Sequence, residues 1–171
     1  MAVVYLSIGS NIRREYYISR GLDALAAEFG QLRISSIYES EAVGFEGDDF
    51  YNLVVGLETD LALNALYPRL RKIEHDNERS RNAVKFSSRT LDIDILTYDD
   101  YVGDFDGGCL PRNEITRNAF VLWPLAELAD DELHPQLRQS YGSLWQQFDR
   151  QKQVLWRVAF LWQGQQLSEL D

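Results

Sequence analysis

The stretch that decides the fold is Arg89-Thr90-Leu91-Asp92-Ile93-Asp94-Ile95-Leu96. Three aliphatic side chains alternate in it with Asp92 and Asp94, and such period-2 alternation predicts a half-buried β-strand. Because successive side chains of a strand point to opposite faces, the aliphatic groups are expected to face a core. The two carboxylates then share the other face, about 6 to 7 Å apart along the strand. Two such acids repel unless a positive charge lies between them, so a divalent cation is the candidate ligand.

The segments around this stretch follow the same two periodicities. Apolar runs and alternation predict further strands, while apolar residues three and four positions apart predict helices. The predicted strands cover residues 3–8, 32–40, 53–57 and 154–162, and helices are expected over 18–29, 63–73, part of 111–129 and 144–148. Gly9-Ser10-Asn11 is expected to form a turn, and residues 74–88 a polar loop. The order β-α-β-β-α-β favours an α+β sandwich of ferredoxin-like type, with a mainly antiparallel sheet and helices packed on it.

Length and composition narrow the classes of protein that fit. The 171 residues suit one domain with a sizeable core, with a possible C-terminal extension from about residue 151. The 17 basic and 27 acidic residues give a formal net charge of −10, which argues against general nucleic-acid binding. We see no signal sequence and no apolar run of the roughly 18 to 20 residues that span a bilayer, so a cytoplasmic protein without membrane contact is expected. Cys109, His75 and His134 fit no pattern for a nucleophile or a metal site.

The paired acids and the residues before them leave two interpretations open. Mg²⁺ often takes one or two carboxylates together with substrate phosphates, and Asp92 and Asp94 fit that pattern. An ordinary solvated strand face also carries acids two positions apart, and from spacing alone it is the commoner case. Four cations precede the acids within a short stretch: Arg79, Arg81, Lys85 and Arg89. They suit a phosphate-rich ligand, or they simply balance an acidic protein, and the residues alone weigh these two equally.

Five motifs along the chain resemble those of one known family. They are Val4-Tyr5-Leu6-Ser7-Ile8-Gly9-Ser10-Asn11, Ser36-Ile37-Tyr38, Phe50-Tyr51-Asn52, the aspartate stretch itself, and Arg117-Asn118-Ala119-Phe120-Val121-Leu122-Trp123-Pro124-Leu125. In this order, over about residues 2–129, the chain resembles the hydroxymethyldihydropterin pyrophosphokinases. The resemblance implies the ferredoxin-like sandwich and transfer of the terminal diphosphate of ATP to the hydroxymethyl group of a reduced pterin. AMP is the second product, and the reaction is a step of folate biosynthesis.

The same resemblance implies roles for individual residues. Asp92 and Asp94 would hold two Mg²⁺ ions that bridge the phosphates of the co-substrate ATP, and Asp94 is the candidate acceptor of the hydroxyl proton. Arg79, Arg81 and Arg89 would act on the transferred group from a loop that closes over the nucleotide. The pterin would be bound by Ser40, Phe50, Asn52 and Phe120. Contacts with the nucleotide would come from Glu74, Arg81, Lys85, Arg89, Arg112 and Arg117.

Two departures from the family pattern concern the nucleotide pocket. Pro111-Arg112 stands where the family has a Pro-His pair, and Gly107-Gly108-Cys109 lacks the usual basic and threonine residues. A guanidinium at position 112 can still bind a phosphate with two donors, although it cannot act as a neutral imidazole. An active pyrophosphokinase is the leading hypothesis. The alternatives are a non-catalytic paralogue that binds pterin or nucleotide, and an interaction protein that keeps only the fold.

Overall fold

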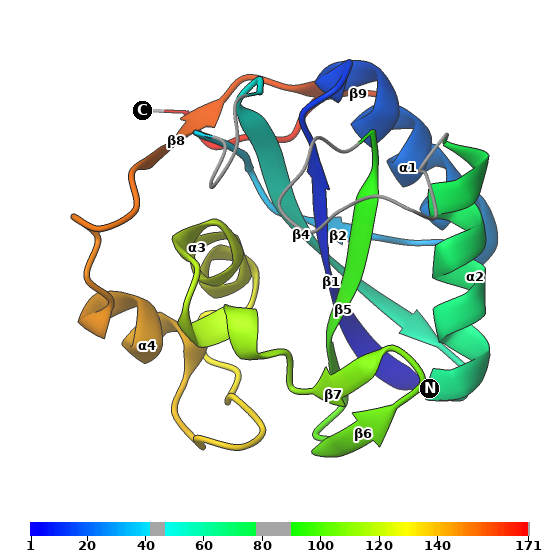
Figure 1. Cartoon of the computed structure of the whole chain (residues 1–171), viewed down its shortest axis with the longest axis vertical. Coiled ribbons are helices and arrows are strands. Elements are labelled where there is room, and N and C mark those ends of the chain that lie inside the picture. The colour runs from blue at the N-terminus through cyan, green and yellow to red at the C-terminus, as the bar shows by residue number, and fades with distance from the viewer. Residues whose placement is uncertain (42–46, 78–89, 171) are drawn as a thin grey trace.

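A single antiparallel sheet forms the centre of the molecule (Figure 1). The structure is a computed structural model that describes residues 1–41, 47–77 and 90–170. Its elements up to the aspartate strand are β1 (Ala2–Ser10), α1 (Arg14–Phe29), β2 (Arg33–Ile34), β3 (Ile37–Ser40), β4 (Phe50–Thr59), α2 (Leu63–Asp76) and β5 (Asp92–Tyr98). They are followed by β6 (Gly103–Phe105), β7 (Gly108–Leu110), the 3-10 helix η1 (Asn113–Thr116), α3 (Ala119–Leu128), α4 (Tyr141–Gln147), β8 (Leu155–Val158), β9 (Leu161–Trp162) and β10 (Gln165–Gln166).

The order of strands in the sheet is β5-β1-β4-β3-β8, with β2 also paired to β4. Every one of these pairs is antiparallel. From β1 to β5 the chain runs strand, helix, two strand segments, strand, helix and strand, which confirms the predicted ferredoxin-like α+β fold. The aspartate strand β5 therefore lies at one edge of the sheet, directly beside the N-terminal strand β1.

The two faces of the sheet are covered by different helices. Helices α1 and α2 lie on one side and pack residues such as Ile18, Leu22 and Leu70 against the aliphatic side chains of the strands. Helices α3 and α4 lie on the other side, where Leu122 and Leu125 of α3 join a smaller core (Figure 1). Burial of these apolar groups on both faces is the main stabilising contribution. The aspartates of β5 lie on the face of the sheet that carries α3.

Three sequence-based boundaries are wrong. The predicted loop over residues 74–88 begins too early, because α2 continues to Asp76 and includes Glu74. The predicted turn at Gly9-Ser10-Asn11 begins too early as well, since β1 continues through Ser10. The predicted strand over residues 32–40 is divided into β2 and β3. At the break, Ser36 donates its backbone N–H and hydroxyl to the Glu127 carboxylate instead of continuing the strand ladder.

The end of the chain also differs from the single strand predicted over residues 154–162. Only β8 joins the main sheet, beside β3, and the chain leaves the sheet before Phe160. The Phe160 ring is 4 % exposed and packs in the core against Tyr51, with ring centroids 6.4 Å apart. After it, β9 and β10 form a hairpin whose turn holds Gln163 and Gly164 at positive φ. Alternation continues along the sequence, but the strand is interrupted between Val158 and Leu161, where Phe160 is buried in the core.

Candidate functional site

The two aspartates of β5 share one face, as their alternation predicts. Leu91, Ile93 and Ile95 are buried in the core beneath α1 and α2. Asp92 and Asp94 point to the opposite face, and the Asp94 side chain is 28 % exposed. They are therefore accessible carboxylates on a strand whose other side is fixed by apolar packing.

Glu74 supports this strand from behind. Its Oε2 accepts a hydrogen bond of 2.8 Å from the backbone N–H of Ile93, and its Oε1 lies 3.2 Å from a guanidinium nitrogen of Arg71. The residue is only 1 % exposed. These contacts suit a residue that holds the backbone of β5 at Ile93, between Asp92 and Asp94. The nucleotide contact expected for Glu74 stays a prediction.

A row of paired residues crosses the sheet from Asp92. In the strand register Asp92 lies opposite Gly9, Gly9 opposite Asn52, and Asn52 opposite Tyr38. Directly opposed residues of antiparallel strands project from the same face, so Asp92 and Asn52 share a face with only Gly9 between them. A Cβ on Gly9 would stand 2.7 Å from Asn52 Oδ1, closer than any real contact allows. Gly9 thus leaves room for the Asn52 amide. The sequence predicted Gly9 in a turn, and that prediction gave no sign of this role.

The other predicted pterin residues gather on this same face. Ser40 and Phe50 are opposed in the pairing of β3 with β4, and Asn52 Nδ2 donates to Ser40 Oγ over 3.4 Å. Phe120 lies in the first turn of α3, which packs over this side of the sheet, and its ring is half-buried. The fold therefore places four residues from three elements on one side of the sheet, with Ser40 and Phe120 separated by 80 positions in the sequence.

A buried polar cluster lies beside these residues. Glu127 of α3 accepts hydrogen bonds from the hydroxyls of Ser36 and Tyr38, and its carboxylate lies 3.8 Å from the guanidinium of Arg157 on β8. Burial and the bond to Glu127 raise the pKa of Tyr38, so this phenol stays protonated. The cluster ties α3, β3 and β8 to one another next to Asn52.

Arg112 brings a positive charge to the aspartates. Its guanidinium lies 3.7 Å from Asp94 and 2.9 Å from Glu114, and its backbone N–H donates to the Leu96 carbonyl of β5. Burial by itself would lower the pKa of Arg112, but the neighbouring carboxylates outweigh it and raise that pKa. Position 112 thus carries a permanent cation within reach of the predicted metal ligands.

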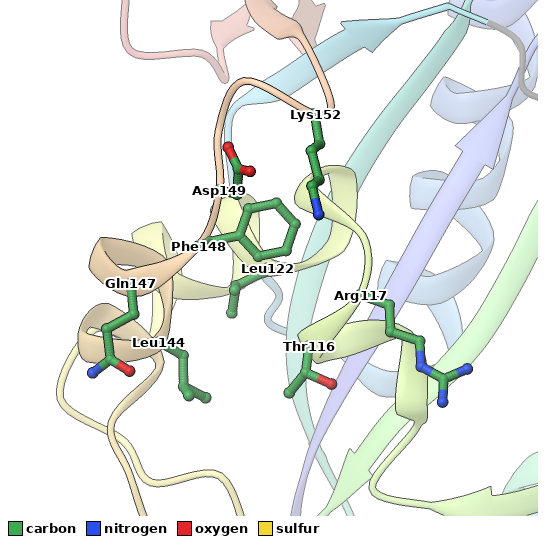
Figure 2. A pocket seen from close by; sticks show the side chains of 8 residues that line it. All are labelled: Thr116, Arg117, Leu122, Leu144, Gln147, Phe148, Asp149 and Lys152. Carbon is green, nitrogen blue, oxygen red and sulfur yellow. The ribbon is translucent and has the colours of Figure 1, made fainter.

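Arg117 lies farther along, at an open hollow of about 370 Å³ between α3 and α4. Figure 2 shows Arg117 and Lys152 along one side of this hollow and Leu144 and Gln147 along the other. Phe148 lies between them as an apolar wall. Within the described part of the chain, the residues that line the hollow include neither Asp92 nor Asp94 and none of the predicted pterin residues. The remaining predicted cations, Arg79, Arg81, Lys85 and Arg89, lie outside the described residues.

The donor set of the aspartate pair fits Mg²⁺. Mg²⁺ is commonly held by one or two carboxylates and completes its coordination with water and substrate phosphate. Asp92 and Asp94 offer two carboxylates on one accessible face, and no group of three or more His, Cys, Asp or Glu side chains suited to a metal occurs among the described residues. In the same described ranges, no helix has the length and apolar character needed to cross a membrane.

Comparison with known proteins identifies the family of this chain. Residues 5–130 match the profile of the family described as 7,8-dihydro-6-hydroxymethylpterin-pyrophosphokinase (HPPK). The 2-amino-4-hydroxy-6-hydroxymethyldihydropteridine pyrophosphokinase of Aquifex aeolicus is 34% identical over 137 residues, which cover 79% of this chain and 85% of that protein. The protein of the same name from Pseudomonas aeruginosa is 35% identical over 132 residues, covering 75% and 81%. The chain belongs to the HPPK family, which confirms the family expected from the sequence.

A solved structure supports the fold independently. Wild-type HPPK-DHPS of Plasmodium falciparum superimposes with a TM-score of 0.68 at 14% sequence identity. The match covers 94% of this chain and 48% of that chain, so this chain spans about half the length of the solved one. At so low an identity the likeness speaks for the fold alone.

Proposed function

We propose that this chain transfers diphosphate from ATP to the hydroxymethyl group of 6-hydroxymethyl-7,8-dihydropterin and releases AMP, a step of folate biosynthesis. One observation carries the proposal: Asp92 and Asn52 share a face, in register, with only the glycine of β1 between them. A carboxylate suited to metal and an amide suited to a heterocycle are thereby adjacent. Membership of the HPPK family supports the assignment. The substrates are soluble small molecules, and we assign the reaction to the cytoplasm.

Asp92 and Asp94 are the residues that would hold two Mg²⁺ ions. When bound, these ions would neutralise phosphate charge and orient the transferred group. The chain itself supplies a strand fixed from behind by Glu74 and by apolar packing, so the carboxylates are positioned before any ligand arrives. Asp94 also presents a carboxylate oxygen that can accept the proton of the attacking hydroxyl.

The pterin side of the site is built for a flat polar ring. Asn52 carries both a donor and an acceptor, which suits the edge of a pterin, and Ser40 supports the amide from the neighbouring strand. The rings of Phe50 and Phe120 supply apolar surface against which a heterocycle can stack. A primary hydroxyl that attacks phosphorus needs positioning and charge neutralisation more than covalent help, and these residues hold the substrate in place.

The nucleotide side depends on cations. Arg112 already lies against Asp94, and its planar guanidinium can bind a phosphate oxygen pair once the ligand is present. We assign Arg117, Arg79, Arg81, Lys85 and Arg89 to the same side, as the family resemblance implies. Together these residues would stabilise charge that develops on the transferred diphosphate.

The direct test is the formation of AMP from ATP and the reduced hydroxymethylpterin in the presence of Mg²⁺. Asp92→Asn and Asp94→Asn are expected to lower kcat by about a hundredfold or more, the scale seen when transition-state charge stabilisation is lost. Asp60→Asn, which removes a carboxylate that is 85 % exposed just after the end of β4, serves as the matched control and should keep full activity. If the folded wild-type protein binds pterin and an ATP analogue but forms no AMP beside an active family member, the non-catalytic alternative holds instead.

A further inference from the structure

The N-terminus of α3 is closed by a residue from the C-terminal segment. The first N–H groups of a helix have no partner within the helix and need one from elsewhere. Asn118, the N-cap residue of α3, makes no capping hydrogen bond with its side chain. Instead, the Ala119 N–H donates to Gln153 Oε1 over 2.7 Å. Gln153 therefore does the work of a capping side chain, although it lies more than thirty positions away in the sequence.

The same side chain holds the chain just before the helix. Gln153 Nε2 donates to the carbonyl oxygen of Arg117, also over 2.7 Å. The Gln153 amide thus binds the backbone on both sides of Asn118, because its oxygen accepts from Ala119 and its nitrogen donates to Arg117. The next residue of the helix is Phe120, so these two hydrogen bonds hold the backbone at the start of the turn that carries the Phe120 ring.

The rest of the C-terminal segment is attached to the other pterin-side element, β3. Strand β8 pairs with β3 from Ile37 to Ser40, and Trp156 Nε1 donates to Glu39 over 3.0 Å. Farther on, the Ile37 N–H donates to Ser168 Oγ over 2.9 Å. The segment after residue 151 consequently contacts both α3, which carries Phe120, and β3, which carries Ser40.

We infer that Gln153 is a positioning residue for the pterin side of the site, acting through the first turn of α3. This rests on the proposed function, because the role of Phe120 in binding the pterin does. The family match ends at residue 130, so it does not extend to Gln153. The segment that the sequence suggested as an extension is, on this reading, part of the substrate site.

Steady-state kinetics of Gln153→Ala test the inference. Loss of a helix cap corresponds to about a fivefold change in an equilibrium constant, so KM for the pterin is expected to rise by about that factor. KM for ATP should rise by less than KM for the pterin, because Arg112 and the two aspartates are not bound by this amide and Arg117 is bound only through its backbone carbonyl. The kcat should stay within about twofold. Gln165→Ala, which alters an exposed glutamine of β10 in the same segment, is the control and should leave all three constants unchanged. Equal changes in KM for both substrates, or a fall in kcat alone, would overturn the positioning role.

Amide hydrogen exchange supplies a readout that does not depend on activity. In Gln153→Ala the N–H of Ala119 should exchange about fivefold faster than in the wild-type protein, as expected when a cap of this strength is lost. Gln153→Glu retains an acceptor for that N–H and should keep it protected. If the wild-type protein forms no AMP while Ala119 loses protection in Gln153→Ala alone, the proposed function fails but the cap stands. If Ala119 exchanges at the same rate in all three proteins, Gln153 does not position α3.

Discussion

Glu74 Oε2 accepts a hydrogen bond of 2.8 Å from the backbone N–H of Ile93, the residue between Asp92 and Asp94. This bond joins the last turns of α2 to β5, which lies at the edge of the sheet formed by the described residues. A buried carboxylate thereby restrains the backbone between the two aspartates. Glu74 thus acts on the backbone between the two aspartates, because its bond is to the N–H of Ile93 and not to either aspartate side chain.

Replacing Glu74 should destabilise the protein in a graded way. Glu74→Ala leaves the Ile93 N–H without its partner, and such an orphaned buried group costs about 1 to 3 kcal/mol of unfolding free energy. Glu74→Gln keeps an amide oxygen as acceptor and should cost clearly less. Arg71→Ala leaves the Ile93 bond in place and removes a partner that is 45 % exposed, so a smaller cost than that of Glu74→Ala is expected. Urea unfolding of the four proteins measures these differences, and equal stabilities of Glu74→Ala and Arg71→Ala would contradict the role of the Ile93 bond.

Gly9→Ala should disturb the site through Asn52. The added Cβ would stand 2.7 Å from Asn52 Oδ1, so the amide must move away from its place beside Gly9. We expect KM for the pterin to rise by about tenfold, the effect of about 1.4 kcal/mol of lost binding.

A double-mutant cycle checks the route of this effect. In the background of Asn52→Ala, which removes the clashing amide, Gly9→Ala should change KM for the pterin by less than about twofold. If the two single effects simply add, the contact between Gly9 and Asn52 is not the cause.

Arg112 should weaken metal binding in the absence of nucleotide. Its guanidinium lies 3.7 Å from Asp94, and a cation at that distance competes with another cation for the carboxylate. Arg112→Ala is therefore expected to bind Mg²⁺ about threefold to tenfold more tightly when no nucleotide is present, while KM for ATP rises because a phosphate donor is lost. Arg112→Lys keeps the charge and should leave the Mg²⁺ affinity near that of the wild-type protein. Calorimetric titration with Mg²⁺ alone decides the first point, and identical affinities in all three proteins would refute it.

His134 should make stability fall in mild acid. Its ring is buried, and Nδ1 accepts backbone N–H groups from Gln136 and Leu137 at 3.2 and 3.0 Å. Burial lowers the pKa of His134 below the usual 6.5. The unfolded chain then binds the proton more readily than the folded one, so unfolding free energy is retained above pH 6.5 and lost as pH falls below it. Urea unfolding between pH 7.5 and 5 should show this loss in the wild-type protein and a smaller loss in His134→Asn, whose Oδ1 can accept the same bonds without titrating.

The strands and the faces of their side chains could be predicted where they depend on the local periodicity of apolar residues. Leu91, Ile93 and Ile95 alternate with the two acids, and a strand has only two faces, so burial of one set exposes the other. The same reasoning failed at Phe160. Its place in an alternating run says that it lies on one face, but not that the chain will leave the sheet to bury it.

By itself, the sequence determined the class of fold, the side of β5 on which Asp92 and Asp94 lie, and the family to which the chain belongs. The tertiary structure decided what stands next to these residues. Asn52 came to lie across Gly9 from Asp92 because β1 pairs with β4 on one side and β5 on the other, and the registers of both pairs had to be fixed. Gln153 reached Ala119 only because β8 pairs with β3. Periodicity reports which way a side chain points, whereas strand pairing and packing over long separations choose its neighbours.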